Sequence, residues 1–98
     1  MRVLLKAQLD TEKGNDAIRS GKLPQVLQEL MEKIKPEAAY FTTDGGLRTM
    51  FFFFDLKDPS QMPVIAEPLF FELGARLDYT PVMNLDDVQK GLSQLKLS

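Results

Sequence analysis

The sequence contains no cysteine and no histidine among its 98 residues. The first absence excludes disulfides and thiolate nucleophiles. The second excludes zinc-type sites, haem ligation by imidazole and any catalytic triad with a histidine base. Oxygen ligands remain for Mg²⁺ or Ca²⁺, but the acidic pair Asp86-Asp87 follows Asn84 as helix-capping residues do. We therefore expect no metal site and no cofactor.

The chain also lacks an excess of positive charge and a long apolar run. It has 12 Lys and Arg against 14 Asp and Glu, whereas a nucleic-acid groove needs clustered cations. No apolar stretch approaches the roughly 20 residues that cross a bilayer, and the N-terminus leads directly into a strand pattern instead of a signal peptide. We expect no nucleic-acid partner, no membrane segment and a cytoplasmic location.

The composition is that of an ordinary globular protein, with 44% hydrophobic and 27% charged residues. A chain of this length buries roughly 60 to 70% of its unfolded surface in one core. No linker, internal repeat or low-complexity segment interrupts it. The sequence therefore predicts a single domain over residues 1–98.

Hydrophobic periodicity predicts the elements of the first half. Residues 2–9 alternate as a strand does, and residues 10–15 supply turn and cap residues. Apolar residues then recur with helical spacing to about Lys35. Gly21 and Pro24 lie inside this helix, so we expect a kink or a restart there.

A hairpin is predicted next, with strands at 38–43 and 47–56 joined by Asp-Gly-Gly at 44–46. The second strand contains four consecutive phenylalanines, Phe51 to Phe54. Because side chains alternate along a strand, two rings must face each side of the sheet. Both sides of this strand are therefore expected to be covered by apolar groups.

The second half repeats the order helix, strand, helix. Asp58-Pro59 is expected to open a helix that Pro68 breaks. Residues 75–83 alternate again, and the proline near their end favours an edge strand. Asn84 then starts a short helix with Lys96 in its last turn.

This order predicts an α+β fold of the ferredoxin-like, split β-α-β type. A four-stranded antiparallel sheet would carry two main helices on one face, with an additional C-terminal helix. The other face would expose phenylalanine rings, and a second copy of the chain is the simplest cover for it. We therefore predict a homodimer in which two sheets face each other.

The sequence resembles the dimeric α/β-barrel superfamily, especially its muconolactone isomerase-like branch. The resemblance rests on the element order, the phenylalanine-rich third strand, and the stretches 67–71 (Glu-Pro-Leu-Phe-Phe) and 77–83 (Leu-Asp-Tyr-Thr-Pro-Val-Met). That superfamily includes cofactor-free isomerases, monooxygenases and proteins of no known activity. Some relatives use histidine in the pocket, and this sequence has none.

Polar and aromatic strand residues form the candidate ligand site. They could line a cavity that binds an anionic or aromatic substrate. The charged residues among them, with Asp78, could equally form cross-strand pairs on a solvated or dimer-lining face, which is the commoner arrangement. The phenylalanines could equally be core and interface residues. The predicted ligand-binding set is Lys6, Gln8, Tyr40, Phe51, Phe53 and Arg76.

The catalytic candidates are Asp78, Tyr79 and Glu67. A tyrosine hydroxyl can donate to a carbonyl or enolate when histidine is missing. A carboxylate beside an apolar pocket has a raised pKa, which suits a general base. A strand tyrosine is more often a packing residue, and a helix glutamate is more often solvated.

Three functions follow from these residues. The first is a cofactor-free homodimer that binds a small hydrophobic or aromatic carboxylate. The second is a non-catalytic self-association module whose open sheet face serves only for pairing. The third is an isomerase or monooxygenase that uses tyrosine or carboxylate acid–base chemistry.

Overall fold

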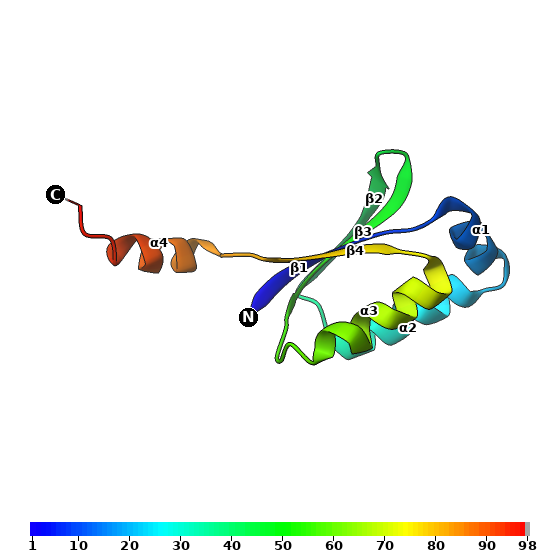
Figure 1. Cartoon of the computed structure of the whole chain (residues 1–98), viewed down its shortest axis with the longest axis horizontal. Coiled ribbons are helices and arrows are strands. Elements are labelled where there is room, and N and C mark those ends of the chain that lie inside the picture. The colour runs from blue at the N-terminus through cyan, green and yellow to red at the C-terminus, as the bar shows by residue number, and fades with distance from the viewer. Residues whose placement is uncertain (98) are drawn as a thin grey trace.

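Four strands form one antiparallel sheet in the order β2-β3-β1-β4 in the computed structural model, which describes residues 1–97 (Figure 1). This is the predicted ferredoxin-like α+β sandwich. The elements in chain order are β1 (Arg2–Gln8), α1 (Thr11–Arg19), α2 (Lys22–Ile34), β2 (Ala38–Asp44), β3 (Leu47–Asp55), α3 (Gln61–Leu73), β4 (Arg76–Pro81) and α4 (Leu85–Ser93).

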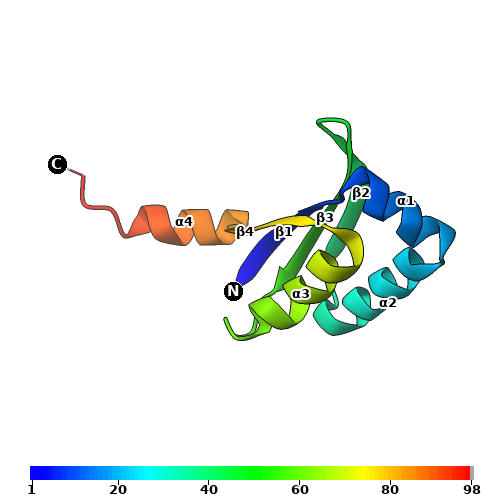
Figure 2. The ribbon, with the colours of Figure 1, turned by 45° about the vertical axis from the view of Figure 1, so that its right-hand side comes forward.

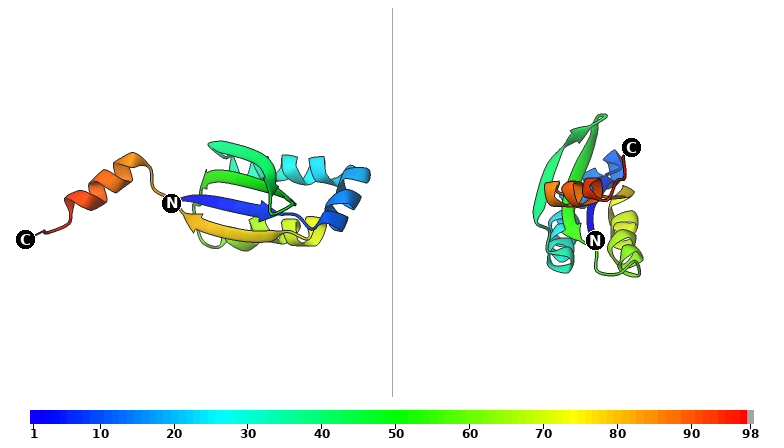
Figure 3. Two further views of the ribbon diagram at one scale, coloured as in Figure 1. Left: turned by 90° about the horizontal axis from the view of Figure 1, so that it is seen from above. Right: turned by 90° about the vertical axis from the view of Figure 1, so that its left-hand side faces the viewer.

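Helices α1, α2 and α3 lie on one face of the sheet and leave the other face uncovered (Figures 2 and 3). The edge strands are β2 and β4, so the edge position predicted for the last strand is confirmed. Helix α4 belongs to neither layer and extends beyond the end of β4 (Figure 1). We call the uncovered side of the sheet the open face.

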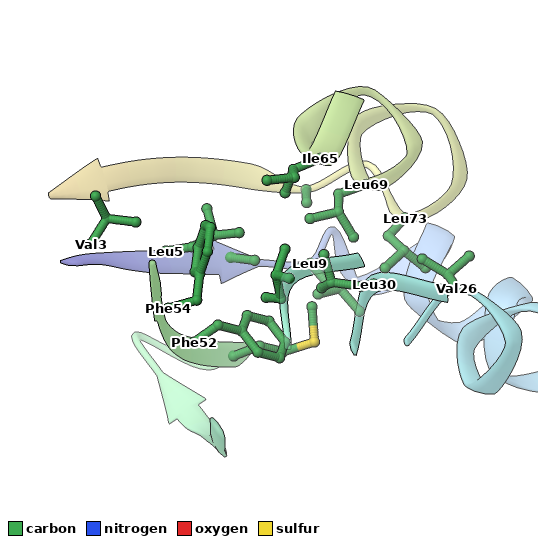
Figure 4. Packing of buried hydrophobic residues seen from close by; sticks show 14 of the residues in the cluster. Val3, Leu5, Leu9, Val26, Leu30, Phe52, Phe54, Ile65, Leu69 and Leu73 are labelled. Atoms are coloured by element: carbon green, nitrogen blue, oxygen red, sulfur yellow. The ribbon is translucent and has the colours of Figure 1, made fainter. Parts of the chain in front are cut away.

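The core lies between the sheet and the helices that cover it. Leu5 and Phe52 are fully buried there, and Phe54 is almost fully buried. Leu30 of α2 and Leu69 of α3 pack toward them from the other layer (Figure 4). The alternation predicted for the phenylalanine run is therefore confirmed, because Phe52 and Phe54 face the helices while their neighbours in sequence do not.

The first helical segment begins earlier than predicted and restarts where expected. Asp10 is the N-cap of α1, and its side chain accepts a hydrogen bond from the backbone N–H of Lys13 at 3.0 Å. The helix therefore begins at Thr11 and not after residue 15. The break falls at Gly21, whose φ of 78° lies in the left-handed region. Pro24 is in the first turn of α2, where its missing N–H has no intrahelical partner to lose.

The prediction that Pro68 breaks the second main helix is wrong. Helix α3 continues through Pro68 to Leu73. A proline at this position leaves the carbonyl of Val64, four residues earlier, without its helical donor. Lys33 of the adjacent α2 donates its Nζ to that carbonyl at 3.2 Å. A contact between helices thus replaces the hydrogen bond that proline removes.

Two helix ends also differ from the prediction. Asp58 and Pro59 form a turn before α3, with the backbone N–H of Gln61 donating to the Asp58 carbonyl at 3.0 Å. Helix α4 starts with a capping box between Asn84 and Asp87, as its acidic pair indicated. It ends at Ser93, so the predicted last-turn Lys96 lies beyond the helix.

Phe52 and Phe51 offer a matched test of the two sheet faces. Replacing Phe52 with alanine leaves a cavity in the core, and we expect the free energy of unfolding to fall by about 3 to 5 kcal/mol. Phe51→Ala removes a ring that is only partly buried in the monomer, so it should lower the free energy of unfolding by clearly less than Phe52→Ala does. Urea unfolding in dilute solution, where any dimer dissociates, measures both; equal losses would contradict the assigned faces.

Candidate functional site on the open face

Strand pairing determines which side chains share the open face. Leu4 is level with Phe53, and Lys6 is level with Phe51. Since residues opposite each other in an antiparallel pair point to the same side, the face can be followed strand by strand. It consists of Leu4, Lys6, Gln8, Ala38, Tyr40, Thr42, Thr49, Phe51, Phe53, Arg76, Asp78 and Thr80. All six predicted ligand-binding residues therefore lie on this one face.

The open face changes character along the strands. Its apolar end, toward the start of β1, carries Leu4, Ala38 and Phe53 at one level. Tyr40 and Phe51 follow at the next level, and Tyr40 is 63% exposed. Contiguous exposed apolar surface of this kind commonly marks a binding site.

At the polar end of the face, toward the β2–β3 hairpin, Lys6 and Gln8 have partners within the chain. Lys6 Nζ lies 2.8 Å from Asp44 Oδ2. Gln8 Nε2 donates to the Asp44 carbonyl at 3.1 Å and to Thr49 Oγ1 at 3.3 Å. These contacts agree with the alternative that the polar side chains pair across strands, and they leave Lys6 and Gln8 less able to bind a substrate.

A hollow of about 520 Å³ opens at the apolar end. Phe53 and Tyr40 form its apolar floor, and Arg2 and Glu37 line its edge. A second hollow of about 890 Å³ continues around the end of the sheet and shares Arg2, Glu37, Val82 and Met83 with the first. The first turn of α4 reaches the second hollow through Asp87.

Arg2 is the cation common to both hollows. Its Nε donates to Glu37 Oε1, and that hydrogen bond raises the pKa of Arg2 above its ordinary value. Asp87 Oδ2 lies 3.8 Å from Arg2 Nη1. A guanidinium has five N–H donors, so donors remain for a ligand after these contacts. Asp55, in the second hollow, accepts a hydrogen bond from Lys57 that lowers the pKa of its carboxyl to about 2.

The three catalytic candidates lie on three different surfaces. Asp78 is on the open face, opposite Lys6. Tyr79 points to the helices, where its hydroxyl donates to the carbonyl of Met62 at 3.0 Å. Burial raises the pKa of Tyr79 to about 12, which makes it a packing residue and a poor proton donor at neutral pH. Glu67 is exposed on α3. The chain does not bring these residues together.

Several residues of the hollows were not among the predicted site residues. Arg2, Glu37 and Met83 come from three segments that meet at the end of the sheet. Arg2 is an even number of residues from the candidate Lys6, so both side chains face the same side of the sheet. This alternation is the one signal in the sequence that could have placed Arg2 near the site. Glu37 and Met83 lie outside the strands, so their position depends on how the strands are ordered.

Within residues 1–97, no three Asp or Glu side chains gather closely enough to hold a metal ion. No helix in the same range is both long and apolar enough to cross a membrane. The open face and its hollows therefore offer aromatic surface, a tyrosine hydroxyl, and the guanidinium groups of Arg2 and Arg76.

The fold and this face define the class: a ferredoxin-like α+β sandwich with three helices on one side of its sheet and an uncovered aromatic surface on the other. The sequence matches no family model, and comparison with curated proteins and with solved structures likewise gave no match.

The environment of Tyr79 predicts a specific dependence on pH. Its pKa is about 12 in the folded chain and about 10 when unfolded, so the unfolded state ionises first as the pH rises. The hydroxyl should contribute about 1 kcal/mol below pH 10, and this contribution should shrink between pH 10 and 12. Urea unfolding of wild type and Tyr79→Phe across this range measures the difference; a difference that does not change with pH would be inconsistent with a pKa of Tyr79 raised by burial.

Proposed function

We propose that the protein is a homodimer, paired through its open face, that binds a small hydrophobic or aromatic carboxylate at the apolar end of that face. The observation that carries this proposal is the coincidence of the exposed Tyr40 ring, the partly exposed Phe53 ring, a hollow and a guanidinium at one place. An uncovered sheet face with this composition is a liability in a monomer and an interface in a dimer.

The hollow supports a ligand with an apolar body and one negative charge. Phe53 and Tyr40 offer ring surface for the body. The remaining donors of Arg2 suit a carboxylate, which a guanidinium binds with two parallel hydrogen bonds. Lys6 and Gln8 do not line this hollow, and both contact Asp44.

A non-catalytic self-association module is the second candidate. It is favoured by the filled interior, since large side chains such as Phe52 and Leu69 occupy the space between sheet and helices (Figure 4). Under this alternative the hollows at the end of the sheet are filled by the second copy and take no ligand.

Affiliation with the muconolactone isomerase-like branch is also part of the proposal, supported by the fold and by the two short resembling stretches. A cofactor-free isomerase or monooxygenase activity has less support, because Asp78, Tyr79 and Glu67 lie on separate surfaces. A carboxylate-binding dimer requires none of these three residues to act together.

Phe51 and Phe71 provide a matched test of the dimer. Phe51→Lys places a second cation beside Lys6 in the middle of the open face, and we expect a monomer because burying like charges together is costly. Phe71→Lys changes an exposed ring on α3 and should leave the dimer intact. Analytical ultracentrifugation at micromolar concentration measures both; a monomeric wild type, or a dimeric Phe51→Lys, would reject pairing through this face.

Ligand binding can be tested with benzoate and its neutral counterpart benzamide. Benzoate should shift the amide resonances of residues around Arg2, Tyr40 and Phe53, and benzamide should do so at least tenfold more weakly because it lacks the charge. Arg2→Gln should remove this preference, while Arg19→Gln, on the exposed surface of α1, should keep it. If millimolar benzoate leaves these resonances unmoved in a dimeric protein, the self-association module is the better description.

A further inference from the structure

Helix α4 leaves the body of the protein in the direction of β4. The backbone N–H of Val82 still donates to the Arg2 carbonyl at 3.2 Å, and Asn84 is extended, so the chain does not turn back over the sheet. The molecule is 60 Å long but only 28 and 18 Å in its other dimensions (Figure 3). Its radius of gyration is 16.0 Å, against about 13 Å for a compact chain of this size.

Helix α4 carries an apolar stripe without a cover. Leu85, Val88 and Leu92 are spaced by three and four residues and so share one side of the helix. Leu85 is 70% exposed and Leu92 is 60% exposed. A helix of nine residues is marginal in water by itself, so this one depends on a surface that its apolar stripe can contact.

The order of strands indicates where a second copy would offer that surface. β4 forms one edge of the sheet and β2 the other. If the two-fold axis of the dimer runs along the strands, β4 of each copy faces β2 of the other, and residues at the same level meet. An axis across the strands through Phe51 would instead place the apolar end of one face on the polar end of the other.

The side chains favour the axis along the strands. With this axis, β3 of one copy lies over β1 of the other. Since Phe53 pairs with Leu4 within each sheet, Phe53 then faces Leu4 of the second copy. Phe51 faces Lys6 of the second copy, which allows a cation–π contact. Tyr40 faces Asp78 of the second copy, whose carboxylate can accept a hydrogen bond from the tyrosine hydroxyl. The apolar level of Phe53 and Leu4 thus meets its own counterpart, and no like charges are opposed.

Thr80 of β4 is level with Ala38 of β2, and α4 begins at Leu85, five residues further on. This arrangement therefore puts α4 of one copy just beyond the start of β2 in the other, next to the segment that joins α2 to β2. The end of α2 lies there and carries Lys33 and the exposed Lys35. The first turn of α4 carries Asp86 and Asp87, so the charges are complementary. We infer that α4 is an exchanged arm that packs against the end of α2 and the segment before β2 in a second copy and closes its hollow; this inference rests on the proposed dimer.

The area of the paired open faces is too small for a stable dimer unless α4 adds to the interface. Four strands about 4.8 Å apart, each about seven residues long at roughly 3.3 Å per residue, give a flat area of roughly 450 Å². Two such faces contribute on the order of 900 Å², while stable interfaces bury about 1,200 to 2,000 Å². A nine-residue helix about 14 Å long and about 10 Å wide adds roughly 140 Å² to each surface it joins. Two arms bring the total to about 1,450 Å².

Cross-linking tests the exchange directly, because the chain has no native cysteine. The double variant Pro36→Cys, Val88→Cys, with one cysteine before β2 and one on α4, would be prepared with ¹⁴N and with ¹⁵N, mixed, allowed to exchange subunits and treated with a short bis-maleimide. Mass spectrometry should find linked peptides in which one partner is ¹⁴N and the other ¹⁵N. Single-isotope links without any mixed link would show that the arm folds onto its own chain, and absence of the link would show that the arm does not reach the segment before β2; either result overturns the inference.

Leu92 and Ser93 provide a matched pair for the energetic contribution of the arm. Leu92→Glu charges the apolar stripe, and we expect the Kd of the dimer to rise at least tenfold. Ser93→Glu adds the same charge about 100° around the helix, outside the apolar stripe, and should change the Kd by less than twofold. A dimeric wild type with an unaffected Leu92→Glu variant would overturn the arm and leave the dimer standing. A wild type that is monomeric at micromolar concentration would overturn both.

Discussion

Four consecutive phenylalanines in β3 are the constraint on which the rest of the structure depends. The period of a strand sends Phe52 and Phe54 into the layer of helices, where they are the largest buried side chains. The same period sends Phe51 and Phe53 to the open face. A single layer of helices can cover one side of a sheet only. The core and the exposed aromatic surface therefore arise from the same short segment.

The proposed ligand site and the proposed dimer interface share one end of the molecule, where three features coincide. At the polar end of the open face, Lys6 and Gln8 already have partners within the chain. The apolar end carries the exposed ring of Tyr40, opens into the hollows around Arg2, and is also where the chain continues into α4. A second copy that covers the rings would also decide how closed the hollow is. In this proposal, binding and assembly depend on one surface.

The places where local rules failed show how tertiary contacts override them. Pro68 was expected to end α3, but Lys33 from a neighbouring helix donates to the carbonyl that proline leaves free. Asp78 and Tyr79 are adjacent in sequence and so face opposite sides of the sheet, which strand period alone could have indicated. Arg2, Glu37 and Met83 could not be grouped in this way, because they come from segments that meet only once the strands are ordered.

The sequence by itself determined the class of fold, the alternation of each strand and the chemistries that a chain without cysteine or histidine lacks. These are properties of composition and of local period, and they need no knowledge of neighbours. Only the tertiary structure decided which side of the sheet the helices cover, where the hollows open and that α4 stands apart from the body. Those outcomes depend on crossover direction and strand order, which are contacts between residues far apart in the chain.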